Sequence, residues 1–252
     1  MFDQAWIPTQ AKVIDLSADA RWEFAQQKLS KRHLCCGKEF VYGLAELQPN
    51  TIQEANFVAN PGCFATAIQL ALLPLAKQDK LHDQVHVSAI TGSTGAGAHP
   101  SSTTHFSWRS NNASVYKAFT HQHLGEIRAS IFSLQSKVPN IHFIPMRGAF
   151  TRGILAACYQ KIDESEQEIK EWFISYYSEA PFVHLSENPI SVKQVVNTNK
   201  ALIHLEKIGD QILITVAIDN LLKGASGQAV QNMNMMMGWD ERMGLSLKPS
   251  VF

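Results

Sequence analysis

The chain has 252 residues, 45% of them hydrophobic and 17% charged, which is enough for one large domain or two modest ones with apolar cores. Its 22 basic and 22 acidic residues cancel, so no long-range field favours nucleic acid or an acidic membrane surface, whereas a small anionic substrate remains compatible. The sequence has neither a basic segment leading into an apolar one at its start nor about 18 uncharged apolar residues in a row, so we expect no secretion signal and no membrane partner.

The first third of the chain predicts two short strands and one buried helix. Residues 12–16 and residues 56–59 are short apolar runs, and the second run ends at an Asn-Pro-Gly turn. Residues 64–73 are apolar almost all round, so we expect a buried helix that Pro74 stops or kinks. Cys63 is therefore predicted to lie at a strand-turn-helix junction.

The middle of the chain predicts a strand, a glycine-rich loop and an amphipathic helix. Residues 85–90 have the pattern of a strand that leads into residues 91–97, where glycines allow a backbone to approach a ligand closely. From His123 onward, apolar residues recur at helical spacing. The first turn of that helix places His123 and Glu126 on one face.

The last third predicts a strand over residues 153–160, a helix after residue 163, strands over residues 201–206 and 211–218, and a helix over about residues 225–237. Asp163 and Glu166 have the spacing of a capping box, which would begin the first of these helices. Gly209 and Asp210 lie between the two later strands and predict a β-hairpin.

Cys63 is the leading candidate for a nucleophile. A thiol at a helix amino terminus lies at the positive end of the helix dipole, beside free backbone N–H groups, so we expect a lowered pKa and much thiolate near neutral pH. Cysteine is often a core residue. Cys35, Cys36 and Cys158 lie in no comparable turn, so we interpret them as structural or incidental. The four cysteines have the spacing of neither a disulfide framework nor a metal site, so a reducing cytoplasm is expected.

His123 and Glu126 form a second constellation. Histidine moves protons at neutral pH, and a carboxylate one turn away fixes its tautomer and raises its basicity. His121 lies two residues earlier and is an alternative base. These three residues are also acceptable zinc ligands, but no further ligands complete such a site, and we expect no metal.

Neither the glycine-rich loop nor any other segment matches the dinucleotide fingerprint Gly-x-Gly-x-x-Gly or the phosphate loop that ends in Gly-Lys-Ser/Thr. The loop alone is equally compatible with a tight connection and with a ligand cradle. Arg147 and Arg152 could clamp a carboxylate or a phosphate with paired N–H donors. The alternative, that they are solvated surface arginines, is equally compatible with the sequence.

Taken in order, the motifs resemble those of N-acetyl-gamma-glutamyl-phosphate reductases over nearly the full length. They are Val13-Ile14-Asp15-Leu16-Ser17-Ala18-Asp19 with Arg21, Val41-Tyr42-Gly43-Leu44, Asn60-Pro61-Gly62-Cys63, Gly95-Ala96-Gly97, Thr104-His105-Phe106, His121-Gln122-His123 with Glu126, Arg152-Gly153-Ile154, Ala217-Ile218-Asp219-Asn220-Leu221-Leu222-Lys223-Gly224-Ala225, and Gly227-Gln228-Ala229-Val230-Gln231-Asn232-Met233-Asn234. No single motif is decisive, but the ordered set is specific to that family.

The resemblance implies NADPH-dependent reduction of N-acetyl-gamma-glutamyl phosphate to the semialdehyde in arginine biosynthesis, through a thioester on Cys63. It implies that His123 handles the proton on the developing oxygen and that Glu126 orients this histidine. The residues implied to bind substrate are His121, Arg152 and Asn60, and those implied to line the NADP cofactor are Ser17, Gly95, Ala96, Gly97, Asn220 and Lys223.

The implied fold is α/β: part of a Rossmann-type dinucleotide-binding domain over residues 1–63, a catalytic and oligomerisation domain like that of glyceraldehyde-3-phosphate dehydrogenase over residues 64–222, and a helix over residues 223–252 that returns to the first domain. A homo-oligomer, dimer or tetramer, is expected by analogy.

Three departures from the family leave alternatives open. The glycine-rich first strand and helix are absent from these residues, Ala98 replaces an arginine, and Pro145-Met146 replaces Pro-His. The alternatives are a truncated reductase that binds NADPH poorly, a reductase with an N-succinyl substrate, a cysteine hydrolase or acyltransferase that uses Cys63 and His123, and a binding protein.

Overall fold

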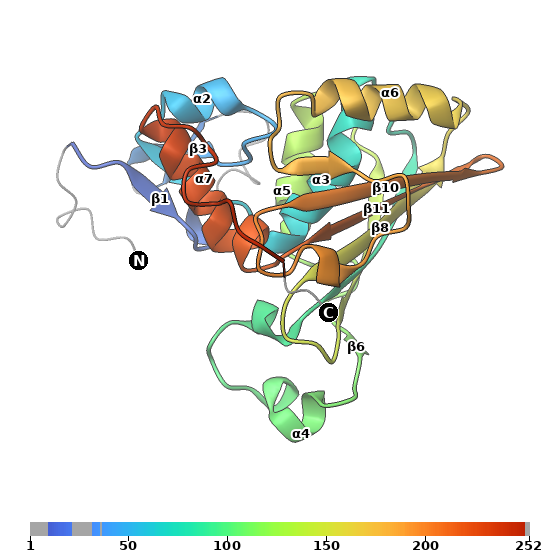
Figure 1. Ribbon diagram of the computed structural model, residues 1–252, viewed down its shortest axis with the longest axis horizontal. Helices are drawn as coiled ribbons and strands as arrows, with labels where there is room; N and C mark the ends of the chain where they lie inside the picture. The colour runs from blue at the N-terminus through green and yellow to red at the C-terminus, as the bar shows by residue number, and fades with distance from the viewer. Residues whose placement is uncertain (1–9, 22–31, 36, 250–252) are drawn as a thin grey trace.

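The computed structural model describes residues 10–21, 32–35 and 37–249, in which two β-sheets of unequal size lie side by side (Figure 1). The smaller sheet has the strand order β1-β4-β3-β2, with β1 (Val13–Asp15), β4 (Phe57–Ala59) and β3 (Lys38–Tyr42) parallel and β2 (Arg32–Cys35) antiparallel. The prediction of strands at β1 and β4 is confirmed. β1 is half-buried, because among the described strands it is the edge strand of its sheet.

Two helices cover the smaller sheet, namely α2 (Pro49–Gln53) and α7 (Gly227–Met236). Helix α7 packs on α2 and β1 although more than 170 residues of sequence separate them. The core between them includes Val41, Ile52, Val58, Met235 and Met236. Apolar residues from both ends of the chain therefore make one core, and this core brings the last helix beside the first strand.

The larger sheet has seven strands in the order β6-β7-β5-β8-β11-β10-β9. They are β5 (Gln84–Thr91), β6 (Ser114–Val115), β7 (Asn140–Arg147), β8 (Ile154–Lys161), β9 (Val183–Leu185), β10 (Ala201–Ile208) and β11 (Gln211–Ile218). Strands β10 and β11 pair antiparallel from Ala201–Ile218 to Ile208–Gln211, which confirms the predicted hairpin. The predicted strands at β5 and β8 are confirmed as well, and β7 is a strand that periodicity did not single out.

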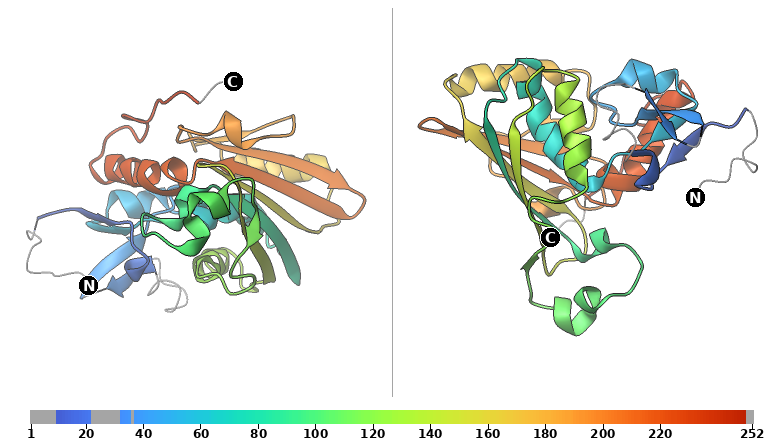
Figure 2. Two further views of the ribbon diagram at one scale, coloured as in Figure 1. Left: turned by 90° about the horizontal axis from the view of Figure 1, so that it is seen from below. Right: turned by 180° about the vertical axis from the view of Figure 1, so that it is seen from behind.

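Helices α3 (Cys63–Lys77), α5 (His123–Phe132) and α6 (Glu166–Tyr176) lie on one face of the larger sheet (Figures 1 and 2). Side chains alternate along the strands, so in β8 Ala156 and Cys158 enter the core, whereas Tyr159 on the opposite face is 41% exposed. Cys158 is thus a core residue, as predicted.

The prediction that Pro74 ends or kinks α3 is wrong about the end, because the helix continues to Lys77. Proline has no N–H, so the carbonyl of Leu70 loses its helical partner. The Tyr177 hydroxyl donates a hydrogen bond of 2.6 Å to that carbonyl. A tertiary contact therefore satisfies the group that Pro74 leaves free.

The predicted capping box at Asp163 is also wrong by two residues. Ser165 is the N-cap of α6, its hydroxyl accepts from the Glu168 N–H at 3.2 Å, and Glu168 accepts in return from the Ser165 N–H at 2.9 Å. Both pairs have the required spacing in the sequence, and only the backbone decides between them.

Residues 92–113 leave the larger sheet as a lobe that contains the 3₁₀ turns η2 (Ser93–Ala96) and η3 (Ser102–Thr104) and helix α4 (Phe106–Arg109) (Figure 2). The chain rejoins the larger sheet at its edge strand β6. The glycine-rich loop thus contains one short turn, η2. A single π-helical segment, η5 (Leu222–Ser226), joins β11 to α7. Figure 1 shows that the part of the lobe around α4 projects away from both sheets.

Candidate active site

Cys63 lies at the junction of the two sheets, as the first residue of α3, directly after the turn that follows β4. It borders a cavity of 510 Å³. The lining is Leu16, Arg21, Asn60, Pro61, Gly62, Cys63, Phe64, Thr91, Thr94, Gly95, Ala96, Gly97, Tyr116, Lys117, His121, Gln122, His123, Arg147, Asn220, Leu221, Gly224 and Ala225. The cavity therefore joins the predicted nucleophile, both predicted histidines and the glycine-rich loop.

Two glycines permit close packing around Cys63. A Cβ on Gly62 would collide with the His123 ring, and a Cβ on Gly224 would lie 2.8 Å from the Cys63 Cβ. Gly62 thus lets the imidazole approach the turn, and Gly224 lets η5 approach the thiol. The segment after β11 is thereby part of the wall around the nucleophile.

The predicted lowering of the Cys63 pKa is wrong for this structure. Burial raises the pKa of the thiol to about 11; the Phe64 N–H and Arg21 lower it, and Glu126 raises it further. The helix terminus acts in the predicted direction, but desolvation of the thiolate outweighs it. The resting residue is therefore a thiol at neutral pH, and nucleophilic attack requires a proton acceptor.

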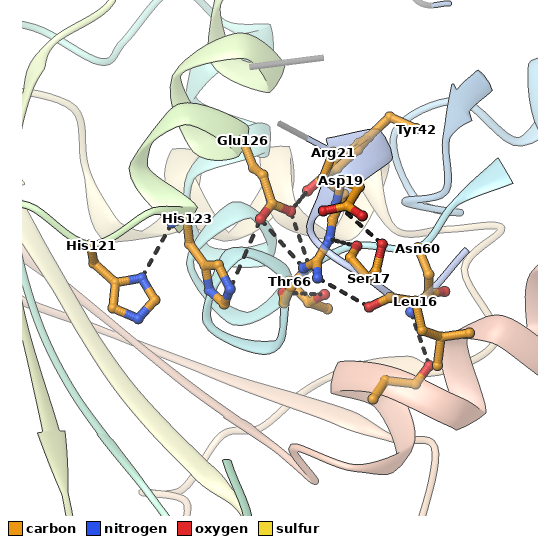
Figure 3. A network of polar contacts seen from close by, with 12 residues as sticks. Leu16, Ser17, Asp19, Arg21, Tyr42, Asn60, Thr66, His121, His123 and Glu126 are labelled. Atoms are coloured by element: carbon orange, nitrogen blue, oxygen red, sulfur yellow. Dashed lines mark hydrogen bonds and ion pairs between the residues drawn. The ribbon is translucent and has the colours of Figure 1, made fainter. Parts of the chain in front are cut away.

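Glu126 is the centre of the polar network around the turn (Figure 3). Its carboxylate accepts hydrogen bonds from the Tyr42 hydroxyl at 2.8 Å and the Gly62 N–H at 2.9 Å, and it lies 3.5 Å from the Arg21 guanidinium. Gln69 donates to Tyr42 in turn. Burial raises the pKa of Glu126, and Arg21 is the largest opposing influence. Glu126 thus holds the turn that carries Cys63.

His123 and His121 are both buried beside Glu126, with ring centroids 4.5 Å apart. Burial lowers the pKa of each to about 3; the next cause is His123 for His121 and Arg21 for His123. His123 Nε2 lies 3.9 Å from Glu126 Oε1, which is too long for a direct hydrogen bond. Both rings are therefore neutral near pH 7.

The tautomer of His121 follows from its hydrogen bond. The backbone N–H of His123 donates to His121 Nδ1 at 3.2 Å (Figure 3). A neutral imidazole whose Nδ1 accepts must carry its proton on Nε2. His121 is thus a fixed N–H donor in the cavity wall, whereas His123 Nδ1 is buried without a partner.

The two predicted anion clamps lie apart. Arg147, at the end of β7, lines the cavity, but Arg152 is absent from its lining. Arg152 pairs instead with the buried carboxylate of Asp219 at 3.0 Å. The structure therefore favours Arg147 over Arg152 as a group that meets substrate.

Three other predicted contacts have structural partners. Asn60 lines the cavity, yet its amide donates to the Ala225 carbonyl at 3.0 Å and accepts from Asn232 at 3.2 Å. Lys223 is fully buried and lies 2.5 Å from Glu46, outside the cavity lining. Ser17 is exposed and bonds to Asp15. Each of these side chains therefore has a partner within the protein.

The remaining predicted cofactor residues lie together. Gly95, Ala96, Gly97 and Asn220 all line the cavity. Asn220 donates to Thr94 at 3.1 Å and accepts from the Gly153 N–H at 2.6 Å, so it links the glycine-rich loop to the start of β8. One wall of the cavity is thus made of small residues and backbone.

Sequence reasoning missed Tyr116 and Lys117, and it used Tyr42 and Arg21 only as parts of motifs. Tyr42 in β3 and Arg21 after β1 both reach Glu126, so the signal was their place in the order of motifs and not any local spacing. The Cys36 prediction lies outside the described residues, as does the Cys35 side chain.

Within the described ranges, no group of three or more His, Cys, Asp or Glu side chains is arranged to hold a metal ion. None of the helices described in the structure is both long and apolar enough to cross a membrane.

Comparison with known proteins gives consistent matches. The family model described as "Semialdehyde dehydrogenase, dimerisation domain" matches residues 63–220. The N-acetyl-gamma-glutamyl-phosphate reductases of Christiangramia forsetii and Bacteroides fragilis are 52% and 54% identical over 96% and 98% of the chain, which is 73% of each relative. Aspartate semialdehyde dehydrogenase II from Vibrio cholerae, complexed with ASA, is similar in fold, with a TM-score of 0.66 at 15% identity over 90% of this chain and 72% of that one. A probable aspartate-semialdehyde dehydrogenase from Pseudomonas aeruginosa has a TM-score of 0.61 at 14% identity, covering 90% and 73%.

Proposed function

Because the chain belongs to the N-acetyl-gamma-glutamyl-phosphate reductases, the phosphorylating semialdehyde dehydrogenases of arginine biosynthesis, we propose that Cys63 is the residue that forms the thioester in this reaction. One observation carries the assignment. Cys63 is the thiol that borders the 510 Å³ cavity, and it does so beside two neutral imidazoles.

In the proposed reaction, Cys63 Sγ attacks the γ-carbonyl carbon of the acyl phosphate, the carbon–oxygen bond to phosphate breaks, and phosphate leaves with the electron pair. The thiol proton passes to an imidazole of the cavity, and we assign this step to His123. After reduction of the thioester, His123 gives its proton to the oxyanion of the thiohemiacetal and takes it back as the carbonyl re-forms. The carbon–sulfur bond then breaks, which releases the aldehyde and the Cys63 thiolate, and the thiolate recovers the proton from His123.

His121 supports the charge that develops on the carbonyl oxygen. Its Nε2–H is fixed by the hydrogen bond at Nδ1, and a neutral imidazole that donates a hydrogen bond can stabilise an oxyanion. The Glu126 carboxylate accepts a hydrogen bond from the Gly62 N–H and lies 3.9 Å from His123 Nε2. We therefore assign Glu126 a positioning role, with Tyr42 and Arg21 holding its carboxylate.

The cofactor proposed for this chain is NADP, which supplies the hydride when bound. The residues present fit the nicotinamide end, because Gly95, Ala96 and Gly97 make a wall of small side chains beside Cys63 and Asn220. A Cβ on Gly97 would meet no atom within 4 Å, so the space in front of that residue is open. Lys223 and Ser17 are not assigned to the cofactor, because their side chains have other partners.

We also propose that the protein is a homo-oligomer. The matched family description names a dimerisation domain, and the face of the larger sheet opposite α3 and α6 carries half-exposed apolar side chains, among them Ile90, Ile144, Leu155 and Leu213. A second copy of the chain would bury this face.

The test is the reverse reaction, in which the purified protein reduces NADP with N-acetylglutamate semialdehyde and inorganic phosphate. Wild-type turnover that needs phosphate and is lost in Cys63→Ser is expected. Cys158→Ser is the matched control, because that thiol lies in the core away from the cavity.

Other outcomes separate the alternatives. Hydrolysis of a thioester or acyl phosphate by Cys63 without any nicotinamide would favour a hydrolase or acyltransferase. Failure of these 252 residues to bind NADPH in a fluorescence titration, with Cys63 still alkylated by a substrate-like reagent, would favour a cofactor-deficient form. Activity that survives in Cys63→Ser would refute the assignment of the nucleophile.

A further inference from the structure

Two arginines without a carboxylate partner meet at the cavity end of β7. Arg147 ends that strand and lines the cavity, and Arg109 ends α4 in the lobe. Among the described residues, neither lies within ion-pair distance of an acidic side chain. By contrast, Arg21 forms an ion pair with Glu126, and Arg152 forms one with Asp219.

Arg109 is unusual because it is only 7% exposed. Its guanidinium donates to the Gly148 carbonyl at 3.3 Å and to the Ser114 hydroxyl at 3.2 Å, and it stacks 4.8 Å from the Trp108 ring. Its Nε is buried without a partner. Buried charges in proteins are usually paired, so this one needs a counter-ion that the described part of the chain does not provide.

Unlike Arg109, Arg147 lines the cavity. Its guanidinium stacks over the Tyr116 ring at 4.3 Å and donates to the Thr103 hydroxyl at 3.4 Å, and its Nε is also buried without a partner. Burial, and then Arg147, lower the pKa of Arg109, which indicates that the two like charges repel each other. An anion bound by Arg147 in the cavity would offset the repulsion between the two charges.

We propose that Arg147, with Arg109 nearby, binds a carboxylate of the substrate that is remote from the reacting carbon and so determines specificity. This inference rests on the function proposed above and names the group recognised at that site. A guanidinium such as that of Arg147, 4.3 Å from the Tyr116 ring, can donate paired N–H groups to a carboxylate, which an ammonium such as that of Lys117 cannot do.

Two carboxylates of the substrate could be the group that Arg147 binds. One is the α-carboxylate of the glutamyl unit, and the other is a second carboxylate on the N-acyl group, as in a succinyl group. The experiment separates the two carboxylates.

The experiment uses three unreactive ligands and needs neither cofactor nor turnover. N-acetylglutaminamide has no carboxylate, N-acetylglutamine has the α-carboxylate, and N-succinylglutamine has both. The full chain is titrated with each by calorimetry and by protection of Cys63 from iodoacetamide. The variants are Arg147→Gln, Arg147→Lys, and Arg128→Gln, which removes the same charge from the exposed face of α5.

The expected result is that a carboxylate-bearing ligand binds wild type more tightly than N-acetylglutaminamide, and that Arg147→Gln removes roughly 10-fold or more of this gain. Arg147→Lys should keep part of it, and Arg128→Gln should change affinity by less than about twofold. A gain that appears with N-acetylglutamine assigns the α-carboxylate, and one that appears only with N-succinylglutamine assigns the acyl carboxylate.

Two results would overturn the inference. One is equal affinity of wild type for all three ligands, or a carboxylate gain that survives in Arg147→Gln. The other is a reverse reaction in which Arg147→Gln raises the KM for inorganic phosphate and leaves that for the semialdehyde unchanged, because Arg147 would then bind phosphate. A chain that shows the carboxylate gain but no phosphate-dependent reduction of NADP would refute the proposed function and leave this inference standing.

Discussion

At the scale of single residues, Cys63 experiences two opposing influences. The Phe64 N–H and the Arg21 guanidinium favour its thiolate, while burial and the Glu126 carboxylate favour its thiol. Burial prevails, so the pKa lies at about 11. Since His121 and His123 are uncharged for the same reason, the resting site contains a neutral thiol beside neutral imidazoles. Such a site stores no reactive thiolate between turnovers.

This balance predicts how the reactivity of Cys63 depends on pH. The alkylating species is the thiolate, and its fraction rises about tenfold per pH unit below the pKa. The rate of Cys63 alkylation by iodoacetamide should therefore keep rising from pH 7 toward about pH 11, with Cys63→Ser giving the background. A rate that levels off near pH 8 would show that the thiolate is stabilised and that burial does not dominate.

At the scale of elements, the start of α6 shows how local signals compete. Asp163 and Ser165 both precede a glutamate by three residues, and each is a good N-cap residue. The helix begins after Ser165, whose hydroxyl and N–H both bond within the box. Ile169 and Phe173 then enter the core, so the buried face of the helix sets where its first turn lies.

The two candidate caps predict different effects on stability. Ser165→Ala should lower the free energy of unfolding by about 1 kcal/mol, because it removes the cap that satisfies the Glu168 N–H. Asp163→Ala, at an exposed position outside the box, should change it by less than about 0.5 kcal/mol. Urea unfolding of both variants is the measurement. A larger loss of unfolding free energy in Asp163→Ala than in Ser165→Ala would show that Asp163 is the N-cap.

At the scale of the whole molecule, the two sheets are joined by a buried ion pair. Glu46 follows β3 of the smaller sheet, and Lys223 lies in η5 after β11 of the larger sheet. Their side chains are 1% and 0% exposed and 2.5 Å apart, and Lys223 also donates to Gln231 of α7 at 2.8 Å. Because Gly224 of η5 packs on Cys63, this pair fixes a segment that borders the nucleophile.

Removal of one partner leaves the other charge buried without compensation. Lys223→Met is expected to lower the free energy of unfolding by about 3–5 kcal/mol. The double variant Lys223→Met/Glu46→Leu should recover much of that loss, since apolar groups of similar size can replace a buried pair. Urea unfolding of the single and double variants measures the coupling, and additive losses would show that the two side chains do not interact.

The open face of the larger sheet makes a prediction about assembly. Leu155→Glu places a charge among the half-exposed apolar side chains of β8 and its neighbours, so it should shift an oligomer toward the monomer. Light scattering after size exclusion gives the mass of each species. Ile174→Glu, which places the same charge at an exposed apolar residue of α6 on the other side of the sheet, is the control, and an unchanged mass in Leu155→Glu would exclude this face from the interface.

Much of the chain could be predicted from sequence because its signals are local. Apolar periodicity located α3, α5 and the β10–β11 hairpin, and the Asn-Pro-Gly turn placed Cys63 at a helix start. The ordered motifs identified the reductase family and the α/β fold. The division at residues 63 and 222 and the roles of Cys63, His123 and Glu126 remain proposals that these signals motivate.

Only the tertiary structure decided which polar groups face the cavity and in what charge state. Arg147 and Arg152 are five residues apart, yet one lines the cavity and the other pairs with Asp219. Lys223 pairs with Glu46, 177 positions away, and Cys63 is a thiol because of what surrounds it. Sequence determines local backbone preference and apolar pattern, whereas burial and charge pairing depend on partners that folding brings together.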